Sequence, residues 1–486
     1  MHETTLYCFY DLAVSPASYD FFIYMQLAEL HRKRHDFSNL FFVFVPGPKD
    51  GFRDDDLSKT IPQRYTMMRN VVIPSCQLLP SCEGVVWLQQ RDQVNLFFER
   101  ANGQVFPRNY TPQEPIEDYL WPGIIAAYLR NETCTMLQEP FEYTEMVDSL
   151  FPDSAKKIIT VTIREAPYNT DRNMDHQAWQ EFLETLDSSK YKIVIIPDTN
   201  NLSNDVFESF EYCKIASIDI LFRIAIYRKA YLNMFHGNGT GIAASFSNSP
   251  LLMTQPVETD GASTIAWFNE VQAIDPNEHN QHAMWKKNQR LIWQRDKGEV
   301  VEDIFKHNQP IASEGNQRTW QGNTTEIIAD AFEQYVEEFP KKTALPVEEH
   351  GFQSNHHTEL ACRVGLEYVI VKSFVQLQQE DIDTLKAIVN LMPYFIKPKH
   401  MLAAIAEKIG DFNTSIQLFD DCINLIGNVC SDSSKTDLYK KFRQSKAEVL
   451  EQANRFDDAL YEYVEISKRY PDDNYFLEKI SSLEQN

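Results

Sequence analysis

The segment Lys157-Ile-Ile-Thr-Val-Thr-Ile163 is a β-branched run of the kind that forms a strand buried on both faces of a sheet. Predicted helices and strands alternate after it: helix 175–186, strand 192–196, helix 217–228, strand 230–235 and strand 250–253. This alternation predicts a parallel sheet with helices on both faces. Residues 151–310 are therefore expected to form one doubly wound α/β domain, and the pattern at 284–305 predicts a closing helix.

The N-terminal part of the chain repeats the same alternation. Its predicted elements are strand 6–10, helix 19–31, strand 39–45 and strand 84–88, which together predict a second Rossmann-like domain over residues 1–150. From residue 323 the pattern contains helices without strands. Phe412 and Phe456 begin two similar helical stretches 44 residues apart, a spacing longer than the roughly 34-residue tetratricopeptide period. Residues 323–486 are expected to form a tetratricopeptide-like helical domain, with an ordinary helical bundle as the alternative.

Composition and charge exclude some classes of function. The chain has 486 residues, with 46 Lys and Arg against 70 Asp and Glu, which gives a net charge of −24. Binding to nucleic acid usually requires a basic surface, so a nucleic-acid partner is not expected. No apolar run approaches the roughly 18–20 residues that a membrane span needs, and the N-terminus has no pattern of a signal peptide. A cytoplasmic location without a membrane span is therefore expected.

The strongest local motif is a glycine-rich loop between a predicted strand and a predicted helix, His236-Gly-Asn-Gly-Thr-Gly241. Glycines let a backbone approach a ligand closely, and free N–H groups at the start of a helix suit a diphosphate. The spacing is neither the dinucleotide-binding pattern followed by an acidic residue nor the phosphate-binding loop that ends in Lys and Ser or Thr. A plain tight turn is the alternative. The candidate diphosphate-binding residues of this loop are Gly237, Asn238, Gly239, Thr240 and Gly241.

A second motif follows the strand at 157–163. Arg164 stands at the strand end, where its guanidinium could hold a phosphate in bidentate fashion, and Asn169 and Arg172 offer further donors in the same loop. The alternative is a solvated loop that leads into a helix. Farther along, Asp219, Arg223 and Tyr227 follow one another at four-residue intervals on one helix face, which predicts a structural Asp–Arg pair, with direct contact to a ligand as the alternative.

These features in this order resemble a bacterial group of GT-B-fold glycosyltransferase-like proteins and, more distantly, the fucosyltransferase-type GT-B enzymes. The resemblance covers roughly residues 5–310 and also includes these segments: Tyr10–Phe21, Val45–Arg53, Ser249–Met253 and Gln289–Asp296. It implies two Rossmann-like domains that face each other across a cleft. It also implies a hexosyl- or deoxyhexosyl-type transferase that moves a sugar from a nucleotide-sugar donor to a glycan or protein acceptor.

The resemblance also implies where the chemistry takes place. The donor diphosphate would lie on the second domain, against Arg164 and the glycine loop, and no metal or other cofactor would be needed because cationic side chains can stabilise the leaving diphosphate. An inverting enzyme needs a general base beside the acceptor hydroxyl. Asp11, at the end of the first strand, is the first candidate and Asp20 the second, since an Asp at a helix N-terminus is often a cap. His236 is a further candidate, and a retaining mechanism stays open.

The helical region is expected to bind the acceptor or a protein partner. The alternative function is a catalytically inactive GT-B scaffold that acts as a protein-interaction module through the helical tail. A retained glycine loop together with Arg164 favours the enzyme, because a scaffold needs neither.

Overall fold

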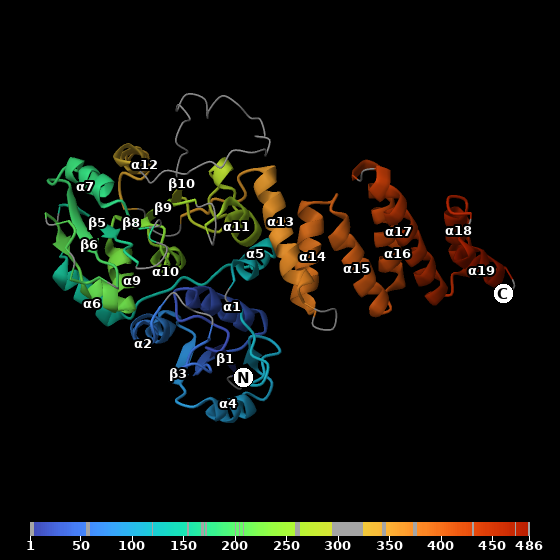
Figure 1. Ribbon diagram of the computed structural model, residues 1–486, viewed down its shortest axis with the longest axis horizontal. Coiled ribbons are helices and arrows are strands. Elements are labelled where there is room, and N and C mark those ends of the chain that lie inside the picture. The colour runs from blue at the N-terminus through green and yellow to red at the C-terminus, as the bar shows by residue number, and fades with distance from the viewer. Residues whose placement is uncertain are drawn as a thin grey trace. The chain divides into compact units, whose positions relative to one another are not determined.

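The computed structural model divides into two units of internal contacts, and each unit is considered by itself (Figure 1). The first contains Met1–Tyr128 and Glu132–Leu360, and the second contains Leu129–Asn131 and Ala361–Asn486. The residues described are 4–54, 59–118, 120–152, 155–166, 170, 173–199, 201–203, 205–207, 209–257, 263–293, 324–342, 347–372, 377–429, 432–471 and 473–484.

The N-terminal sheet of the first unit has four parallel strands in the order β3-β2-β1-β4. Their bounds are β1 Thr5–Asp11, β2 Asn39–Val45, β3 Cys82–Trp87 and β4 Val105–Phe106. Strand β1 lies inside the sheet and is almost fully buried, as its apolar sequence predicts. Register runs from Thr5 opposite Asn39 to Asp11 opposite Val45, so the carboxyl ends of the two central strands lie level with each other.

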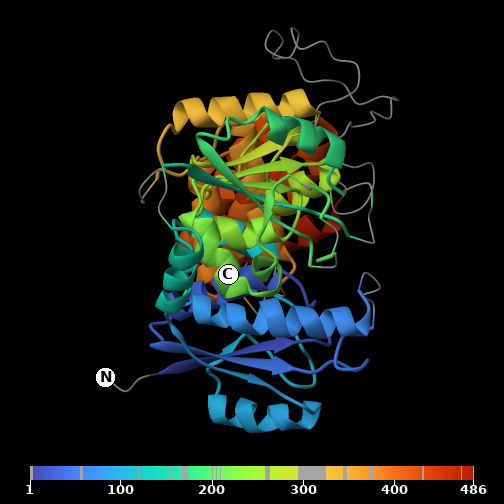
Figure 2. The ribbon, with the colours of Figure 1, turned by 90° about the vertical axis from the view of Figure 1, so that its left-hand side faces the viewer.

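Helices cover both faces of this sheet (Figure 2). On one face, Phe21 at the start of α1 (Phe21–Arg34) packs against Phe42 and Phe44 of β2 with ring centroids 5.8 and 5.3 Å apart. On the other face, α4 (Val94–Ala101) contributes Val94 and Ala101 to a buried cluster with strand residues. Between β2 and β3 the chain forms α2 (Ile61–Met67), which begins with a capping box at Thr60.

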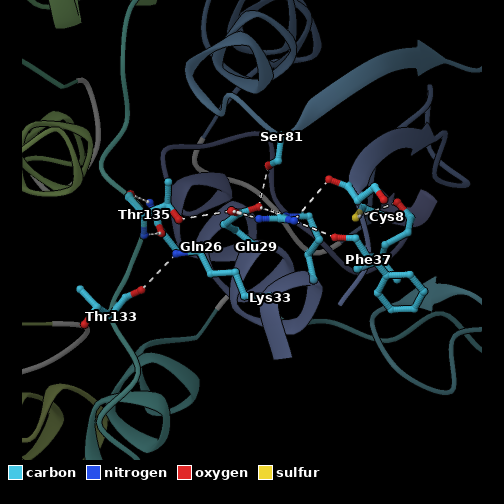
Figure 3. Close-up of polar contacts among 11 residues, drawn as sticks. Cys8, Gln26, Glu29, Lys33, Phe37, Ser81, Thr133 and Thr135 are labelled. Carbon is cyan, nitrogen blue, oxygen red and sulfur yellow. Dashed lines mark hydrogen bonds and ion pairs between the residues drawn. The ribbon is translucent and has the colours of Figure 1, made fainter. Parts of the chain in front are cut away.

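A buried carboxylate on α1 ties three separate segments together (Figure 3). Glu29 is 2% exposed and accepts hydrogen bonds from Arg32, from Ser81 Oγ at 2.6 Å and from Thr135 Oγ1 at 3.3 Å. Burial raises the pKa of Glu29, but the hydrogen bonds from Arg32 and Ser81 outweigh it and hold the pKa below its usual range. Gln26, one turn earlier, exchanges two hydrogen bonds with the backbone of Thr135. This network fixes the chain that leads from the first sheet to the second.

The second sheet of the same unit has six parallel strands in the order β10-β9-β8-β5-β6-β7. Its strands are β5 Lys157–Thr162, β6 Tyr191–Ile196, β7 Glu211–Tyr212, β8 Leu232–His236, β9 Leu251–Gln255 and β10 Gln289–Trp293. The helices between and before them are α5 Trp121–Leu129, α6 Phe141–Leu150, α7 His176–Thr185, α8 Ile215–Ile218, α9 Ile220–Lys229, α10 Thr240–Phe246 and α11 Ile265–Trp267. Strands β5 and β8, which lie next to each other, are the centre of the sheet, as the β-branched run at 157–163 predicts.

The closing helix expected at 284–305 is wrong over its described part. Residues 289–293 form β10, an edge strand that pairs in parallel with β9. Gln289, Leu291 and Trp293 are buried while the two residues between them are half-buried, which is the two-residue period of a strand. The remaining residues of the expected helix, from 294 onward, lie outside the described residues.

Helix α12 (Thr325–Glu338) belongs to the first unit rather than to the helical tail. Its buried residues Ile328, Phe332 and Tyr335 share a core cluster with Trp179 and Phe182 of α7. The bridge between Lys286 and Glu349 adds a further tie to the same unit. The boundary expected at residue 323 thus falls earlier than the division of contacts in the structure, which lies after Leu360.

The second unit is helical throughout its described residues. Most of α13 (Asn355–Ile370) and the following helices belong to it: α14 Gln379–Leu391, α15 Ile396–Lys408, α16 Phe412–Val429, α17 Asp432–Gln452, α18 Phe456–Ser467 and α19 Asn474–Leu483. From α14 to α19, each helix packs against the next along the chain. Contacts between sequence neighbours are the arrangement of helical-repeat proteins. The prediction of a mixed α/β fold with parallel sheets, followed by an all-helical region, is confirmed.

No helix in the described parts of the chain is both long enough and apolar enough to cross a membrane.

Candidate functional site

A cavity of about 840 Å³ lies in the first unit and is lined by residues from both sheets. From the second sheet it receives the segments that follow β5, β6 and β8, so it lies at the carboxyl ends of the parallel strands. From the N-terminal sheet it receives Ser18, Tyr19 and Asp20, which connect β1 to α1. Open α/β sheets bind their ligands at this edge. The cavity therefore coincides with the cleft expected between two Rossmann-like domains.

The glycine loop forms part of the cavity wall, and its glycines are required by close packing. A Cβ on Gly239 would lie 2.8 Å from Cβ of Tyr19, one on Gly237 would lie 2.7 Å from Pro256, and one on Gly241 would lie 2.7 Å from the Met253 sulfur. None of these three glycines has a positive φ. The loop thus needs glycine because neighbouring side chains approach its backbone, and Gly239 in particular lets Tyr19 of the N-terminal sheet reach the second sheet.

Two amide groups of the loop point to an anion site. Gly237 N–H donates to Thr254 O at 2.8 Å, and Thr240 N–H donates to the side chain of Asn238 at 3.1 Å. Gly241 N–H donates to Asn238 O at 3.2 Å. The N–H groups of Asn238 and Gly239 make no hydrogen bond with the described residues, and both residues line the cavity. Two adjacent unused amides are donors for an oxyanion.

Arg223 lines the cavity instead of forming the ion pair that its sequence spacing predicts. The expected pair with Asp219 is wrong: the Asp219 carboxylate caps α9 by accepting from Leu221 N–H and Phe222 N–H at 2.9 and 3.1 Å. The Arg223 guanidinium instead reaches the cavity wall, is 2% exposed, and donates to Ala216 O and to Tyr227 Oη. Among the described residues it forms no ion pair with a carboxylate.

The surroundings of Arg223 keep its charge. Burial lowers the pKa of Arg223, but the phenols of Tyr19 and Tyr227 and the Asp198 carboxylate raise it by more, so the guanidinium stays protonated. Burial also raises the pKa of Tyr19 to about 12, although the charge of Arg223 opposes this, so the Tyr19 hydroxyl is neutral. The charge of Arg223 is thus stabilised by its polar neighbours and by Asp198, without a salt bridge among the described residues. The cavity wall carries three cationic side chains, Lys59, Arg164 and Arg223, and two carboxylates, Asp20 and Asp198.

The other predicted phosphate ligands have different outcomes. Arg164 follows β5 directly, is 7% exposed and lines the same cavity, so the structure brings it together with Arg223 and the glycine loop. Asn169 and Arg172 lie outside the described residues. The position of Arg223 could have been suspected from its helix, whose residues are buried on all sides and leave an Arg no solvated face.

Asp11 is held in an internal network. It is fully buried, and its carboxylate accepts two hydrogen bonds from Arg91 at 2.7 and 2.8 Å, one from Tyr110 Oη at 3.0 Å and one from Ala13 N–H at 3.0 Å. Burial, followed by the charge of Asp11 and its hydrogen bond, raises the pKa of Tyr110. Asp11 does not line the cavity.

Asp20 does line the cavity. Although it stands at the N-cap position of α1, its side chain makes no capping hydrogen bond. Its carboxylate accepts from Ser18 Oγ at 2.7 Å. His236, the third candidate, is 3% exposed and its Nδ1 lies 2.7 Å from Thr254 Oγ1, a satisfied position inside the sheet. Of the three groups, Asp20 is the one whose carboxylate can meet a ligand.

Fold and site together define an α/β unit with two parallel sheets and a cavity lined from both of them, and a separate helical unit. The chain matches no protein-family model and no curated protein sequence. Solved structures resemble it at low identity. The E. coli ADP-heptose LPS heptosyltransferase II has 10% identity and a TM-score of 0.39 over 70% of this chain and 100% of its own. A glycosyl transferase family 9 structure from Veillonella parvula has 12% identity and a TM-score of 0.43 over 70% and 99%.

The helical region has a separate structural neighbour. A thermophilic TPR protein from Thermus thermophilus has 14% identity and a TM-score of 0.15, covering 33% of this chain and 91% of its own. At such identities and TM-scores these likenesses leave the activity to be argued from the cavity itself. The more distant fucosyltransferase-type resemblance stays a prediction.

Proposed function

We propose that the protein is a glycosyltransferase that moves a sugar from a nucleotide-sugar donor to a glycan or protein acceptor. The observation that carries this proposal is Arg223, a buried guanidinium on the cavity wall without a carboxylate partner among the described residues. Arg164 and the unused N–H groups of Asn238 and Gly239 face the same space. A diphosphate matches this set, because its oxygens accept from a guanidinium fork and from backbone amides at once.

In the proposed reaction, the oxygen of an acceptor hydroxyl forms a bond to the anomeric carbon of the donor sugar. The bond from that carbon to the diphosphate oxygen breaks, and its electron pair leaves with the diphosphate. Arg223 and Arg164 stabilise the charge that develops there, in a buried setting where such interactions are strong. Positive side chains would make a metal ion unnecessary, and metal independence, with no cofactor besides the donor, is part of the proposal.

The hydroxyl proton passes to a carboxylate acting as general base. We assign this role to Asp20 ahead of Asp11, because Asp20 lines the cavity and its carboxylate does not cap α1. Asp11, whose oxygens are occupied by Arg91 and Tyr110, would act as a positioning residue for the end of β1. An inverting outcome follows from this single-base arrangement.

The remaining assignments rest on the same proposal. The transferred group would be hexosyl or deoxyhexosyl, the reaction would take place in the cytoplasm, and the helical second unit would bind the acceptor or a protein partner. The competing function is an inactive scaffold that works through its helices. A scaffold has no need for Arg223, Arg164 and the glycine loop around one cavity.

Calorimetry separates the two functions. Titration of the whole protein with ADP, GDP, UDP and CMP should show binding of at least one nucleotide, and addition of EDTA should not abolish that binding. Transfer can then be followed as release of the nucleotide from its sugar conjugate. Heat changes indistinguishable from dilution with all four nucleotides would refute the enzyme and leave the scaffold.

A further inference from the structure

The cavity extends beyond the proposed diphosphate site into a second half. In the sheet order, β9 and β10 lie on one side of β8 and its glycine loop, whereas β5 and β6 lie on the other. The β5–β6 side carries the charged groups Arg164, Asp198 and Arg223. The β9–β10 side has no charged side chain in this lining and contains five rings and one hydroxyl, Trp121, Trp267, Phe268, His282, Trp285 and Ser263, beside aliphatic side chains and the amides of Gln255 and Gln272.

Three of these rings pack on one another. Trp121 stacks on His282 with centroids 4.8 Å apart and planes at 15°, and His282 lies 4.5 Å from Trp285. Trp121 also stacks with Phe246 of α10 at 6.1 Å. Trp121 and His282 are therefore both in contact with two other rings.

Polar atoms stand among these rings without partners. Trp285 Nε1, His282 Nδ1 and Ser263 Oγ make no hydrogen bond in the described structure, although their residues are 3%, 3% and 1% exposed. Burial lowers the pKa of His282 to about 3, with His357 and His350 adding to the effect, so the imidazole is neutral and offers one donor and one acceptor nitrogen. Unsatisfied buried polar groups are unfavourable, and all three belong to residues of the cavity wall, so a ligand with hydroxyl groups that reached them would satisfy them.

We propose that the β9–β10 half of the cavity, around Trp285, His282 and Ser263, binds the sugar ring of a substrate. The inference rests on the proposed function and adds to it the residues that recognise the sugar. A ring of hydroxyls presents both donors and acceptors, which is what an indole N–H, a neutral imidazole nitrogen and a serine hydroxyl require. The sugar can belong to the nucleotide donor or to a glycan acceptor.

A nucleobase cannot stack on the Trp121–His282 pair. Bases bind by stacking on open aromatic faces, and here the faces of Trp121 and His282 are already covered by other rings. The opposite half offers Asp198 at the end of β6. A carboxylate at a strand end is the group that binds ribose hydroxyls in dinucleotide sites. A nucleotide-sugar whose diphosphate lies at Arg223 would therefore extend its ribose toward β6 and its sugar toward β10.

The test uses the full-length protein labelled with 5-fluorotryptophan and followed by ¹⁹F NMR. The chain has seven tryptophans, and the signal of Trp285 is assigned by its loss in Trp285→Phe, which keeps a ring and removes the N–H. Trp179→Phe is the matched control, because Trp179 is also buried and its Nε1 also lacks a partner, but it lies on α7 in a core cluster and not on the cavity. The probes are ADP with ADP-glucose, GDP with GDP-mannose and GDP-fucose, and UDP with UDP-glucose.

The expected result is that a nucleotide-sugar shifts the Trp285 signal and its nucleoside diphosphate does not. Trp285→Phe should then weaken binding of the nucleotide-sugar by about 5- to 10-fold, the effect of one lost hydrogen bond, and binding of the diphosphate by less than about 2-fold. Trp179→Phe should change neither. A shift that appears instead when methyl glucoside or methyl mannoside is added to the diphosphate complex supports the sugar subsite with the acceptor as its source.

Two results would overturn the sugar assignment while leaving the enzyme intact. One is an equal shift of the Trp285 signal by the nucleoside diphosphate and by its sugar conjugate, which would place the base in this half. The other is an unmoved Trp285 signal in complexes that calorimetry shows to be formed. If no nucleotide binds at all, the proposed function fails and this inference fails with it.

Discussion

Arg223→Met tests the central physical argument, which is that the buried Arg223 guanidinium has no carboxylate partner in the free protein and binds an anionic ligand. Methionine fills most of the space of the arginine side chain and carries no charge. The change removes hydrogen bonds to Ala216 O and Tyr227 Oη, and Tyr227 keeps its contact with Thr162 Oγ1 at 2.8 Å. It also removes a charge that is 2% exposed.

The two effects on stability oppose each other. A hydrogen bond from a charged donor contributes about 1.5–3 kcal/mol, whereas burying a charge costs several kcal/mol. We therefore expect the free energy of unfolding of the unliganded variant to lie within about 2 kcal/mol of wild type, or above it. If Arg223 were one half of a buried ion pair, removing it would cost about 3–5 kcal/mol.

The ligand reverses the comparison. At a nucleotide concentration 100 times its dissociation constant, the wild-type protein gains about 2.7 kcal/mol of stability. Loss of a guanidinium contact to the diphosphate worth about 3 kcal/mol weakens binding roughly 100-fold. At the same concentration the variant would then gain only about 0.4 kcal/mol. Urea unfolding with and without nucleotide measures both quantities.

Arg228→Met is the matched control on the same helix. Arg228 pairs with Glu139 at 2.7 Å, and the Glu139 side chain is 6% exposed, so the change leaves a buried carboxylate without its partner. We expect it to lower the stability of the free protein by about 1–3 kcal/mol and to leave nucleotide stabilisation unchanged. The reasoning is refuted if Arg223→Met loses 3–5 kcal/mol without ligand, or if it retains the full nucleotide effect.

Three further predictions concern catalysis, pH and the helical region. Asp20→Asn should lower kcat for sugar transfer by at least about 100-fold with nucleotide affinity unchanged, whereas Asp11→Asn should mainly lower the melting temperature, and the opposite pattern in the two assays would exchange their roles. The pKa of His282 is about 3 in the folded protein and about 6.5 in the unfolded chain, so between these values the unfolded chain binds more protons and the free energy of unfolding decreases as the pH is lowered, by up to about 1.4 kcal/mol per pH unit. Urea titrations at pH 7 and 4.5 should show a smaller decrease for His282→Phe than for wild type, and an equal decrease would contradict the assignment. Deletion of 373–486 should preserve nucleotide binding in calorimetry and abolish transfer to the native acceptor. Deletion of 325–486 also removes α12, whose three buried side chains contribute roughly 5–9 kcal/mol, and should therefore unfold the first unit. A folded product of this longer deletion by circular dichroism would count against this division.

Much of the first unit could be predicted from the sequence because its signals are local. The β-branched run at 157–163 predicts a strand buried on both faces, and its repeated alternation with helices predicts a parallel sheet whose loops gather at one edge. Arg164 and the glycine loop follow strands directly, so their meeting at the cavity follows from topology alone. The two sheets and the helical tail follow from these patterns for the same reason.

Patterns also misled where the partner of a residue lies far away in the chain. Asp219 and Arg223 have the spacing of a helical ion pair. The Asp219 carboxylate instead accepts hydrogen bonds from otherwise unsatisfied N–H groups at the start of its own helix. The edge strand β10 has too short an alternation to be distinguished from a helix end without its partner β9. Helix α12 has an ordinary amphipathic sequence, and only its packing against the apolar side of α7 places it in the first unit.

The sequence by itself determined the class of the fold and the places where a ligand would meet the strand ends, because those depend on periodicity and on the order of strands and loops. The tertiary structure alone decided which charges meet in the cavity. It buried Arg223 without a salt bridge among the described residues, paired Asp11 with Arg91, and left the Asp20 carboxylate without a capping hydrogen bond. It also brought Trp121, His282 and Trp285 together from separate segments. Burial and pairing depend on distant contacts, and those contacts set the charge and the unsatisfied polar atoms through which this site would recognise a substrate.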